Sequence, residues 1–478
     1  MAVIWCLLIL LVAFFTVLAV RAMQFKPIKT EVPAPVPVEV EEAAAAERFQ
    51  AMIRLRTISD LDESKVDKQA FVDFQELLPR LYPRVHAQCS REIIGTYGML
   101  YTWKGRHSNA PSVFMSHYDV VPVNEGDWEE PPFSGNIKNG ELWGRGTLDT
   151  KGTLHGVMEA AEGLLQSGFV PENDIYFAFG GDEEIMGKDA PAIVEVLKKR
   201  GIKPAFVLDE GGAVVENVFP GVKQSAALVG IAEKGSVFMD ITASGKGGHA
   251  SAPPARQSLI SLARALDRLA KKPMSFTLTK STLEMFNVMG RHSSFAYKLI
   301  FANLWCFAPL LDIACQKMGG ELDALVRTTC AFTRAKAADA YNVLPTAATA
   351  GVNLRLISGD TVEGVRQRME KIIDDPNVTL SVVQGMEASP ISTTYDEGWN
   401  RLEKAIGQTY PEALVSPYLM VAATDSRHYC QLSSHVFRFS GMPLTKEQRG
   451  FIHNANERIP LAYLKNTISF FARVIQMS

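Results

Sequence analysis

Imidazoles and carboxylates recur in short segments of this sequence, and an apolar run precedes most of these segments. The segments are MSHYDVVP with His117 and Asp119, GRGTLDTKG with Asp149, GGDEEIMG with Glu183 and Glu184, VLDEGG with Asp209 and Glu210, and IHNANE with His453. Such apolar runs are typical of buried parallel strands, whose carboxyl ends meet at one edge of an open α/β sheet. We therefore expect these side chains to form the site of a two-metal hydrolase.

The chemistry of each residue type suggests a division of roles. Zinc accepts imidazole nitrogen and carboxylate oxygen, and two neighbouring ions need a bridging carboxylate, for which Asp149 is our candidate. His117 would bind one ion, and Asp119 would orient its ring from the other side. Consecutive residues at a strand end point in different directions, so Glu184 would bind metal and Glu183 would act as general base.

Three assignments stay open. Either Asp209 or Glu210 is the terminal carboxylate ligand, and its neighbour would face away. A lone histidine is usually structural, so His453 is a predicted ligand only because the other ligands need a partner. His249 lies in the Gly-rich segment GKGGHASAPP, where it would either donate a hydrogen bond to an oxyanion or serve as a turn residue.

Two further segments predict where a substrate carboxylate binds. Arg427 in ATDSRHY and Asn342 in YNVLP are the stronger candidates for this role. Arg355, on the strand after Asn342, is a third candidate, with an ordinary surface salt bridge as the alternative. An arginine can hold a carboxylate through two hydrogen bonds, which suits a substrate with a free carboxylate.

Together, SHYDVVPV, LWGRGTLDTKG, GGDEE, LDEGG, GGHASAPP and HNANE resemble the dizinc peptidases and amidohydrolases that include carboxypeptidase S, aminoacylase and the N-fatty-acyl-amino-acid synthase/hydrolase. The resemblance covers roughly residues 45–478. It implies two Zn²⁺ per chain, with His117, Asp149 and the VLDEGG carboxylate around one ion and Asp149, Glu184 and His453 around the other. It also implies that Asp119 and Glu183 form the active-site pair, and that His249 acts from a lid domain, often across a homodimer interface.

The order of strand and helix signals predicts an α/β fold. Strands and helices alternate up to about Ser225, which is typical of a largely parallel sheet covered by helices. We expect a catalytic domain of residues 45–226 and 356–478, interrupted by an inserted α+β lid and dimerisation domain at residues 227–355. In this insert, the apolar residues 298–314 favour a packed helix or a subunit contact, with a wall for a long acyl chain as the alternative.

The N-terminal segment predicts a membrane anchor. Residues 2–20 carry no charge and approach the ~20 residues that cross a hydrocarbon core. We expect residues 1–24 to be a transmembrane signal anchor and residues 25–44 a Pro/Val/Glu spacer that holds a non-cytoplasmic catalytic body off the membrane. The alternative is a cleaved signal peptide and a secreted protein.

Composition narrows the choice of function. A net charge of -3 without a Lys/Arg-dense stripe argues against nucleic acid, and the 6 cysteines lack C-x-x-C spacing. We predict a zinc hydrolase that uses a glutamate base on the amide bond of small peptides or N-acyl amino acids with a free carboxylate. The alternatives are an N-fatty-acyl amino acid synthase/hydrolase, or a non-catalytic, membrane-tethered binding protein, against which Glu183 argues.

Overall fold

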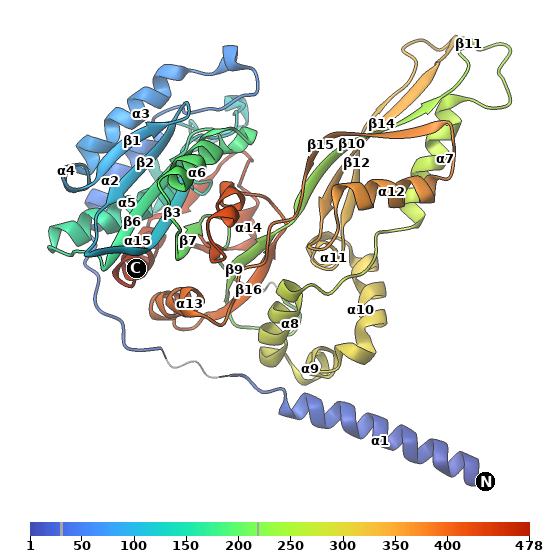
Figure 1. Ribbon diagram of the computed structural model, residues 1–478, viewed down its shortest axis with the longest axis horizontal. Coiled ribbons are helices and arrows are strands. Elements are labelled where there is room, and N and C mark those ends of the chain that lie inside the picture. The colour runs from blue at the N-terminus through green and yellow to red at the C-terminus, as the bar shows by residue number, and fades with distance from the viewer. Residues whose placement is uncertain (29–31, 218) are drawn as a thin grey trace.

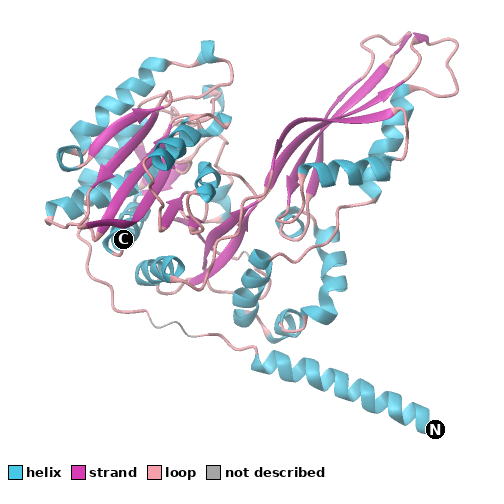
Figure 2. Ribbon diagram, viewed as in Figure 1, coloured by secondary structure: helices cyan, strands magenta, loops and turns pink. Residues whose placement is uncertain are grey.

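A computed structural model describes residues 1–28, 32–217 and 219–478, so part of the predicted spacer, residues 29–31, lies outside the described residues. A large sheet wrapped by helices forms the main body (Figures 1 and 2). A smaller sheet projects from this body. In the same view, the N-terminal helix α1 (Ala2–Gln24) lies at the lower right.

The central sheet is mixed but largely parallel where it carries the predicted site. Its strand order is β1-β2-β6-β3-β7-β17-β9-β8-β18, with β16 paired to β9. The bounds are β1 (Ser90–Ile94), β2 (Gly98–Trp103), β3 (His107–His117), β6 (Asn173–Gly180), β7 (Phe206–Asp209), β8 (Val214–Val215), β9 (Ala226–Glu233), β16 (Leu414–Met420), β17 (Val436–Arg438) and β18 (Pro443–Leu444). Strands β6, β3, β7 and β17 are parallel neighbours. The α/β class predicted from the alternating pattern is therefore confirmed.

Helices bury both faces of this sheet. One face packs against α2 (Glu42–Ile53), α3 (Lys68–Leu81), α4 (Pro83–Gln88), α5 (Lys151–Gln166), α13 (Glu397–Thr409) and α15 (Leu461–Gln476). The other face packs against α6 (Asp189–Lys199) and the 3-10 helix η4 (Asp425–Gln431). Helix α5 begins directly after Asp149 and is buried along nearly its whole length, so the core fixes the segment that follows this carboxylate.

The projecting sheet has the order β12-β14-β10-β15. Its strands are β10 (Gly235–Ser244), β12 (Thr329–Lys336), β14 (Ala347–Leu356) and β15 (Val378–Met386), and α7 (Ser258–Lys271) and α12 (Val362–Ile373) cover one face. A two-stranded ribbon of β11 (Gly248–His249) and β13 (Val343–Leu344) forms its outer tip (Figure 1). Strand β15 pairs with β10, so this sheet continues past the domain boundary predicted at residue 355. A pairing between segments so distant in sequence leaves no local pattern.

Short helices and a small sheet complete the chain. Helices α8 (Lys280–His292), α9 (Phe295–Phe301), α10 (Leu304–Met318) and α11 (Gly320–Ala324) lie beneath the junction of the two sheets (Figure 1). The apolar residues 298–314 thus belong to two helices that meet at a bend of 106°. A three-stranded sheet of β19 (Arg458–Pro460), β5 (Glu141–Trp143) and β4 (Ile137–Lys138) and the helix α14 (Lys446–Arg449) flank the main body.

Candidate functional site

The carboxyl ends of three parallel neighbours create the site. Strand β3 ends at His117, β7 ends at Asp209, and β6, which ends at Gly180, is followed by the 3-10 helix η3 (Glu183–Ile185). Because these strands run in the same direction, the polar residues after them emerge at one edge of the sheet. The structure thus brings His117, Asp119, Glu183, Glu184 and Glu210 together, as the sequence pattern predicts.

Asp149 lies between two imidazoles and contacts each with a different oxygen. Its Oδ1 is 3.2 Å from Nε2 of His117, and its Oδ2 is 3.1 Å from Nε2 of His453. Glu210 Oε1 lies 3.6 Å from the same nitrogen of His117, and Glu184 Oε2 lies 3.1 Å from the same nitrogen of His453. The contacts therefore form two sets of possible ligands that share the carboxylate of Asp149.

The two neighbouring carboxylates Asp209 and Glu210 point in different directions. Glu210 faces His117, whereas Asp209 is buried and accepts a hydrogen bond from the backbone N–H of Ser426 at 3.0 Å. Burial and the charge of Asp149 raise the pKa of Glu210 to about 7. Of the two residues that the sequence leaves open, Glu210 is thus the one that belongs to the cluster.

Asp119 supports the cluster from behind. Its carboxylate Oδ1 is 3.3 Å from Nδ1 of His117, and the hydroxyl of Ser59 donates to its Oδ2 at 2.7 Å. The backbone N–H groups of Glu183 and Glu184 also donate to this carboxylate, at 3.2 and 3.1 Å. Asp119 therefore holds the His117 ring and the η3 turn in one arrangement, which is what a residue that orients a ligand needs.

The charges of the cluster favour bound cations. Burial raises the pKa of Glu183 well above its ordinary value, and burial also raises the pKa of Glu184. Although burial opposes it, contact with Asp119, Asp149 and Glu210 raises the pKa of His117 well above its usual range. Buried Glu184 Oε1 has no hydrogen-bond partner in the described part of the chain. An excess of desolvated carboxylates with a free oxygen is the donor set expected of a divalent metal site, so these residues fit metal ions.

Ligand atoms of His117, Asp149 and Glu184 all lie within 4.8 Å of one another, so the two sets adjoin at the shared carboxylate of Asp149. His453 adopts φ 61°, an uncommon backbone conformation for a residue other than glycine, and its side chain is half exposed. Residues held in such a conformation tend to occur at functional sites. His453 therefore joins the cluster from the solvent side, through the loop that precedes β19.

Glu457 fixes the loop that carries Asp149. This fully buried carboxylate accepts hydrogen bonds from the backbone N–H groups of Gly146, Leu148 and Asp149, at 3.1, 2.7 and 3.2 Å. It also forms an ion pair with the buried side chain of Arg145 at 2.7 Å. The segment that supplies His453 thus also sets the position of Asp149.

A second buried charge network lies behind the cluster. Glu233 is fully buried and accepts from Arg438 Nε at 2.7 Å, from Thr424 Oγ1 at 2.8 Å and from Ser426 Oγ at 3.0 Å. Arg427 Nη1 is 3.8 Å from Glu233 Oε2, and it has no hydrogen-bond partner among the described residues. Burial lowers the pKa of Arg427, and the charges of Arg438 and Arg355 lower it as well, whereas the charge of Glu233 opposes them.

The structure does not bring His249 or Asn342 to the cluster of their own chain. Both lie at the tip of the projecting sheet, far from the main body (Figure 1). They are neighbours there, because the N–H of Ala250 donates to the backbone oxygen of Asn342 at 3.1 Å. The His249 side chain is exposed and its Nδ1 pairs with the hydroxyl of Ser251 at 2.8 Å.

Sequence reasoning missed several residues that hold the site. Glu457 is the last residue of the polar loop IHNANE, and its position after His453 could have marked it as a residue of the site. Glu233 follows an apolar strand, as the predicted site residues do, so the same rule applied to IAEKG finds it. Asp425 is another missed acid, since its carboxylate lies beside Gly180 at the end of β6. Nothing in the local sequence marks Ser59.

A largely apolar cavity of about 480 Å³ lies next to the segments that carry Glu210 and His453, although no residue of the acidic cluster lines it. It reaches Gly211, which follows Glu210, and Ile452, which precedes His453; its walls include Leu228, Ala324 and Met420. A void of about 40 Å³ between α8 and α11 shares Leu228 and Tyr418 with this cavity and is lined by Met285, Met289 and Phe219. This largely apolar volume therefore extends from the segments after Glu210 and before His453 toward α8.

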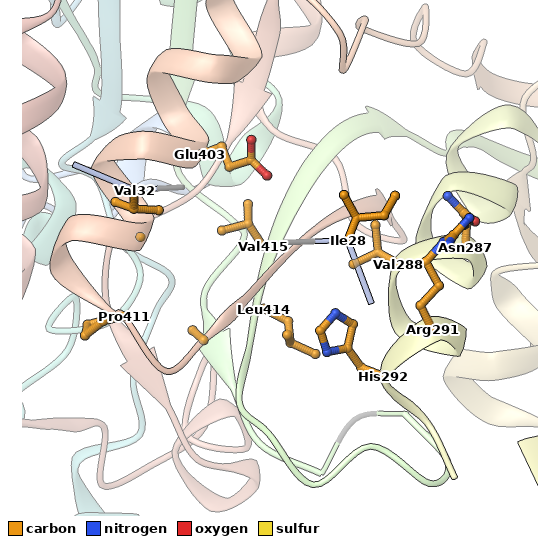
Figure 3. A pocket seen from close by; sticks show the side chains of 12 residues that line it. Ile28, Val32, Asn287, Val288, Arg291, His292, Glu403, Pro411, Leu414 and Val415 are labelled. Carbon is orange, nitrogen blue, oxygen red and sulfur yellow. Dashed lines mark hydrogen bonds between the residues drawn. The ribbon is translucent and has the colours of Figure 1, made fainter. Parts of the chain in front are cut away.

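Another cavity, of about 440 Å³, lies where residues Ile28 and Val32 pass between α8 and α13 (Figure 3). His292 and Arg291 point toward it from α8, and Leu414 and Val415 line it from β16. Its lining includes neither a residue of the acidic cluster nor a sequence neighbour of one. We therefore place the chemistry of this protein at the strand ends and not in this cavity.

Sequence comparison agrees with this geometry. The model of the peptidase family M20/M25/M40 matches residues 113–477. A probable carboxypeptidase S-like 2 of Dictyostelium discoideum is 34% identical over 481 residues, covering 98% of this chain and 92% of that protein. The N-fatty-acyl-amino acid synthase/hydrolase PM20D1 of Xenopus tropicalis is 37% identical over 446 residues, covering 92% and 87%.

Solved structures share the fold. The M20 family metallo-carboxypeptidase Sso-CP2 of Sulfolobus solfataricus matches with a TM-score of 0.66 at 15% identity, covering 92% of this chain and 99% of that one. The YXEP protein of Bacillus subtilis, described as a dinuclear metal-binding peptidase, matches with a TM-score of 0.55 at 13% identity, covering 91% and 98%. The chain belongs to the peptidase family M20/M25/M40. It is a hydrolase of that family, as its motifs predict.

Replacing Glu457 tests its hold on Asp149. The variant Glu457→Gln loses the negative charge that pairs with buried Arg145. It also loses one of the two oxygens that accept the three backbone N–H groups, so the Asp149 loop becomes less fixed. We expect metal affinity to fall about 10- to 100-fold, the usual effect of removing a residue that orients ligands. Metal content at limiting zinc, measured by mass spectrometry, checks this.

The exposed Glu447→Gln serves as the control, because this side chain is 76% exposed and is expected to leave metal content unchanged. Equal zinc affinity in Glu457→Gln and the unmodified protein would contradict the positioning role.

Proposed function

We propose that this protein is a dizinc hydrolase that cleaves the amide bond next to an amino acid with a free carboxylate. The observation that carries the proposal is the Asp149 carboxylate between the imidazoles of His117 and His453. His117, Asp149 and Glu210 would hold one ion, and Asp149, Glu184 and His453 the other. When bound, such ions polarise a carbonyl group and lower the pKa of water at the site.

Glu183 would move the proton during the reaction. Its Oε2 lies 3.8 Å from Nε2 of His117, at the inner side of the cluster, and its side chain is mostly buried. Burial raises its pKa above the ordinary value of a glutamate, and a raised pKa strengthens a carboxylate as a proton acceptor. Glu183 would take this proton from the attacking water and return it to the leaving amine nitrogen.

We assign the recognition of the substrate carboxylate to Arg427, with Asn342 as a second contact and Arg355 as a third candidate. The Nη1 of Arg427 lies 3.8 Å from Glu233 Oε2 and lacks a hydrogen-bond partner among the described residues, so the guanidinium keeps an unused donor. Asn342 and His249 lie together at the distant tip, which supports a homodimer in which each tip completes the site of the partner. His249 would then donate to the oxyanion of the reacting carbonyl.

Two substrate classes fit this chemistry, and the relatives carry names from both. The main reading is a carboxypeptidase S-like enzyme that acts on small peptides, like the relative from Dictyostelium discoideum. The apolar cavity of about 480 Å³ beside Glu210 favours a second candidate, N-acyl amino acids with a long acyl chain. An apolar pocket of this size with few polar groups suits an alkyl chain better than a peptide.

We further propose that α1 anchors the protein in a membrane, with the catalytic body on the non-cytoplasmic side. Helix α1 is 23 residues long, is almost wholly exposed and is apolar enough to cross a membrane. Secretion after cleavage of this helix is the alternative, which N-terminal sequencing of the mature protein decides.

Substitution of the proposed base separates an enzyme from a binding protein. In Glu183→Gln, the proton acceptor is lost while the proposed metal ligands remain, so we expect kcat to fall about 10²- to 10⁴-fold with zinc content unchanged. Release of free amino acid from a panel of dipeptides and N-acyl amino acids, followed by mass spectrometry, measures this.

The matched control is Glu195→Gln on α6, whose side chain is 54% exposed and far from the proposed chemistry. Full turnover by Glu183→Gln would contradict the role of Glu183 as the base. No turnover of any substrate by the unmodified protein would favour a binding protein of this fold.

Mixing two inactive variants tests the exchange of His249 between subunits. If His249 acts on the partner's site, a mixed dimer of Glu183→Gln and His249→Ala contains one complete site. After unfolding and refolding an equal mixture, we expect about a quarter of the activity of the unmodified dimer, since half of the dimers are mixed. Refolding Glu183→Gln with the double variant Glu183→Gln/His249→Ala provides no complete site and serves as the control. Absence of recovery in both mixtures would argue against action across the interface.

Filling the apolar cavity tests the second substrate class. The variant Ala324→Phe places a ring in the cavity wall, so we expect kcat/KM for a hexadecanoyl amino acid to fall by at least about tenfold. Hydrolysis of an acetyl amino acid or a dipeptide should change less than about threefold.

The same substitution in the other cavity, Ala413→Phe, controls for the added ring. Equal losses for short and long substrates in Ala324→Phe would show that the acyl chain does not enter the cavity beside Glu210.

A further inference from the structure

Helix α1 is attached to the body along its second half. Arg21 Nε donates to the backbone oxygen of Ala302 at 3.1 Å, and Asn303 Nδ2 donates to the backbone oxygen of Leu18 at 3.1 Å. Further along, the rings of Phe14 and Trp305 are in edge contact, with centroids 6.1 Å apart. The helix therefore packs against the corner where α9 meets α10, and only its first half is free of the body (Figure 1).

The length of α1 has a consequence for α10. A helix rises ~1.5 Å per residue, so the free part before Phe14 is only about 20 Å long. A hydrocarbon core is ~30 Å thick, and a spanning α1 must therefore also immerse the residues between Phe14 and Arg21. Phe14 lies about 10 Å from Arg21 along the axis, so Trp305 would reach a similar depth below the headgroups.

The surface of α10 is suited to that depth. Trp305, Pro309 and Ile313 follow one another at intervals of one helical turn, and all are exposed. The exposed fractions are 61% for Trp305, 58% for neighbouring Leu310 and 52% for Ile313. The acid on this helix, Asp312, is bound to Arg327 of the body. An apolar strip of this kind, continuous with a membrane-length helix, marks an interaction surface.

Basic side chains border the strip where a headgroup layer would lie. Arg21 ends the apolar run of α1, and Lys26 follows it. Arg291 stacks on the ring of Phe25 at 4.6 Å and donates to the backbone oxygen of Lys26 at 2.9 Å. Lys298 lies on α9, beside this junction. Cations flanking an apolar surface pair with lipid phosphates while their stems cover apolar area.

We propose that α9 and α10 form a second membrane element, which lies in the interfacial layer of a lipid bilayer beside α1. Acyl chains would cover the strip of Trp305, Pro309 and Ile313, and phosphate groups would meet the bordering cations. The proposal rests on the proposed anchoring by α1. It adds that the body is fixed to the bilayer surface through α9 and α10, and does not move freely on the spacer of residues 25–44.

Lipid photolabelling of the full chain tests this proposal. The protein is reconstituted in vesicles of phosphatidylcholine and phosphatidylserine that contain a phosphatidylcholine with a diazirine in its acyl chain, and labelled peptides are mapped by mass spectrometry. We expect labels in α1 and in the peptide that contains α10. Labels in α1 alone overturn the proposal but leave the anchor intact, whereas absence of labels in both overturns the anchor as well.

A variant separates immersion from chance contact. In the triple variant Trp305→Gln, Leu310→Gln, Ile313→Gln, we expect labelling of α10 to fall at least about fivefold with α1 labelling unchanged, since polar side chains disfavour the hydrocarbon region. The control pair Val382→Gln, Val383→Gln changes exposed residues of β15 and should alter neither label. Dipeptide hydrolysis at the unmodified rate shows that the triple variant is folded. Crosslinks between two protein copies at α10, in place of lipid labels, would overturn the proposal.

Discussion

The contact of Asp149 with both His117 and His453 is the constraint on which the rest of the site depends. A carboxylate can face two partners at once only if its backbone is fixed, and here the carboxylate of Glu457 fixes it by accepting the surrounding N–H groups. The strand ends supply the other side chains without special geometry, since parallel neighbours already end together. The loop between β5 and α5 is therefore the part of the site whose position depends on a contact with a distant segment.

Burying so many acids near one another costs stability that the rest of the fold must offset. Desolvated carboxylates repel each other, and their raised pKa values reflect this repulsion and their burial. In the Glu233 network, the charge of Arg438 offsets the charge of the buried carboxylate, and two hydroxyl groups donate hydrogen bonds to it. The loop of Thr424 and Ser426 links the networks, since Ser426 also binds Asp209. The Glu233 network contains its own cation, Arg438, whereas the acidic cluster has an excess of carboxylates that fits bound cations.

Much of this arrangement could be predicted from the sequence. Apolar runs that end in His117, Glu183 and Glu210 identify strand ends, and the parallel order of the strands makes them converge. The choice between Asp209 and Glu210 could not be made, because it depends on which side of β7 faces the loop of Ser426. The position of Glu457 after His453 is the one local signal for that residue, whereas Ser59 acts through a contact between distant segments, so its local sequence carries no pattern. The limit of the projecting sheet was missed for the same reason, since β15 joins it by pairing with β10.

The position of Glu457 in the chain also bears on when the enzyme becomes active. This residue and Asp149 are separated by 308 residues, and His453 lies in the same late segment. During synthesis, the three strand ends can fold early, but the loop of Asp149 has no carboxylate to hold it until that segment leaves the ribosome. A partly synthesised chain that lacks this segment therefore carries an incomplete cluster. The late placement of His453 and Glu457 in the sequence therefore makes the assembled cluster a property of the finished chain.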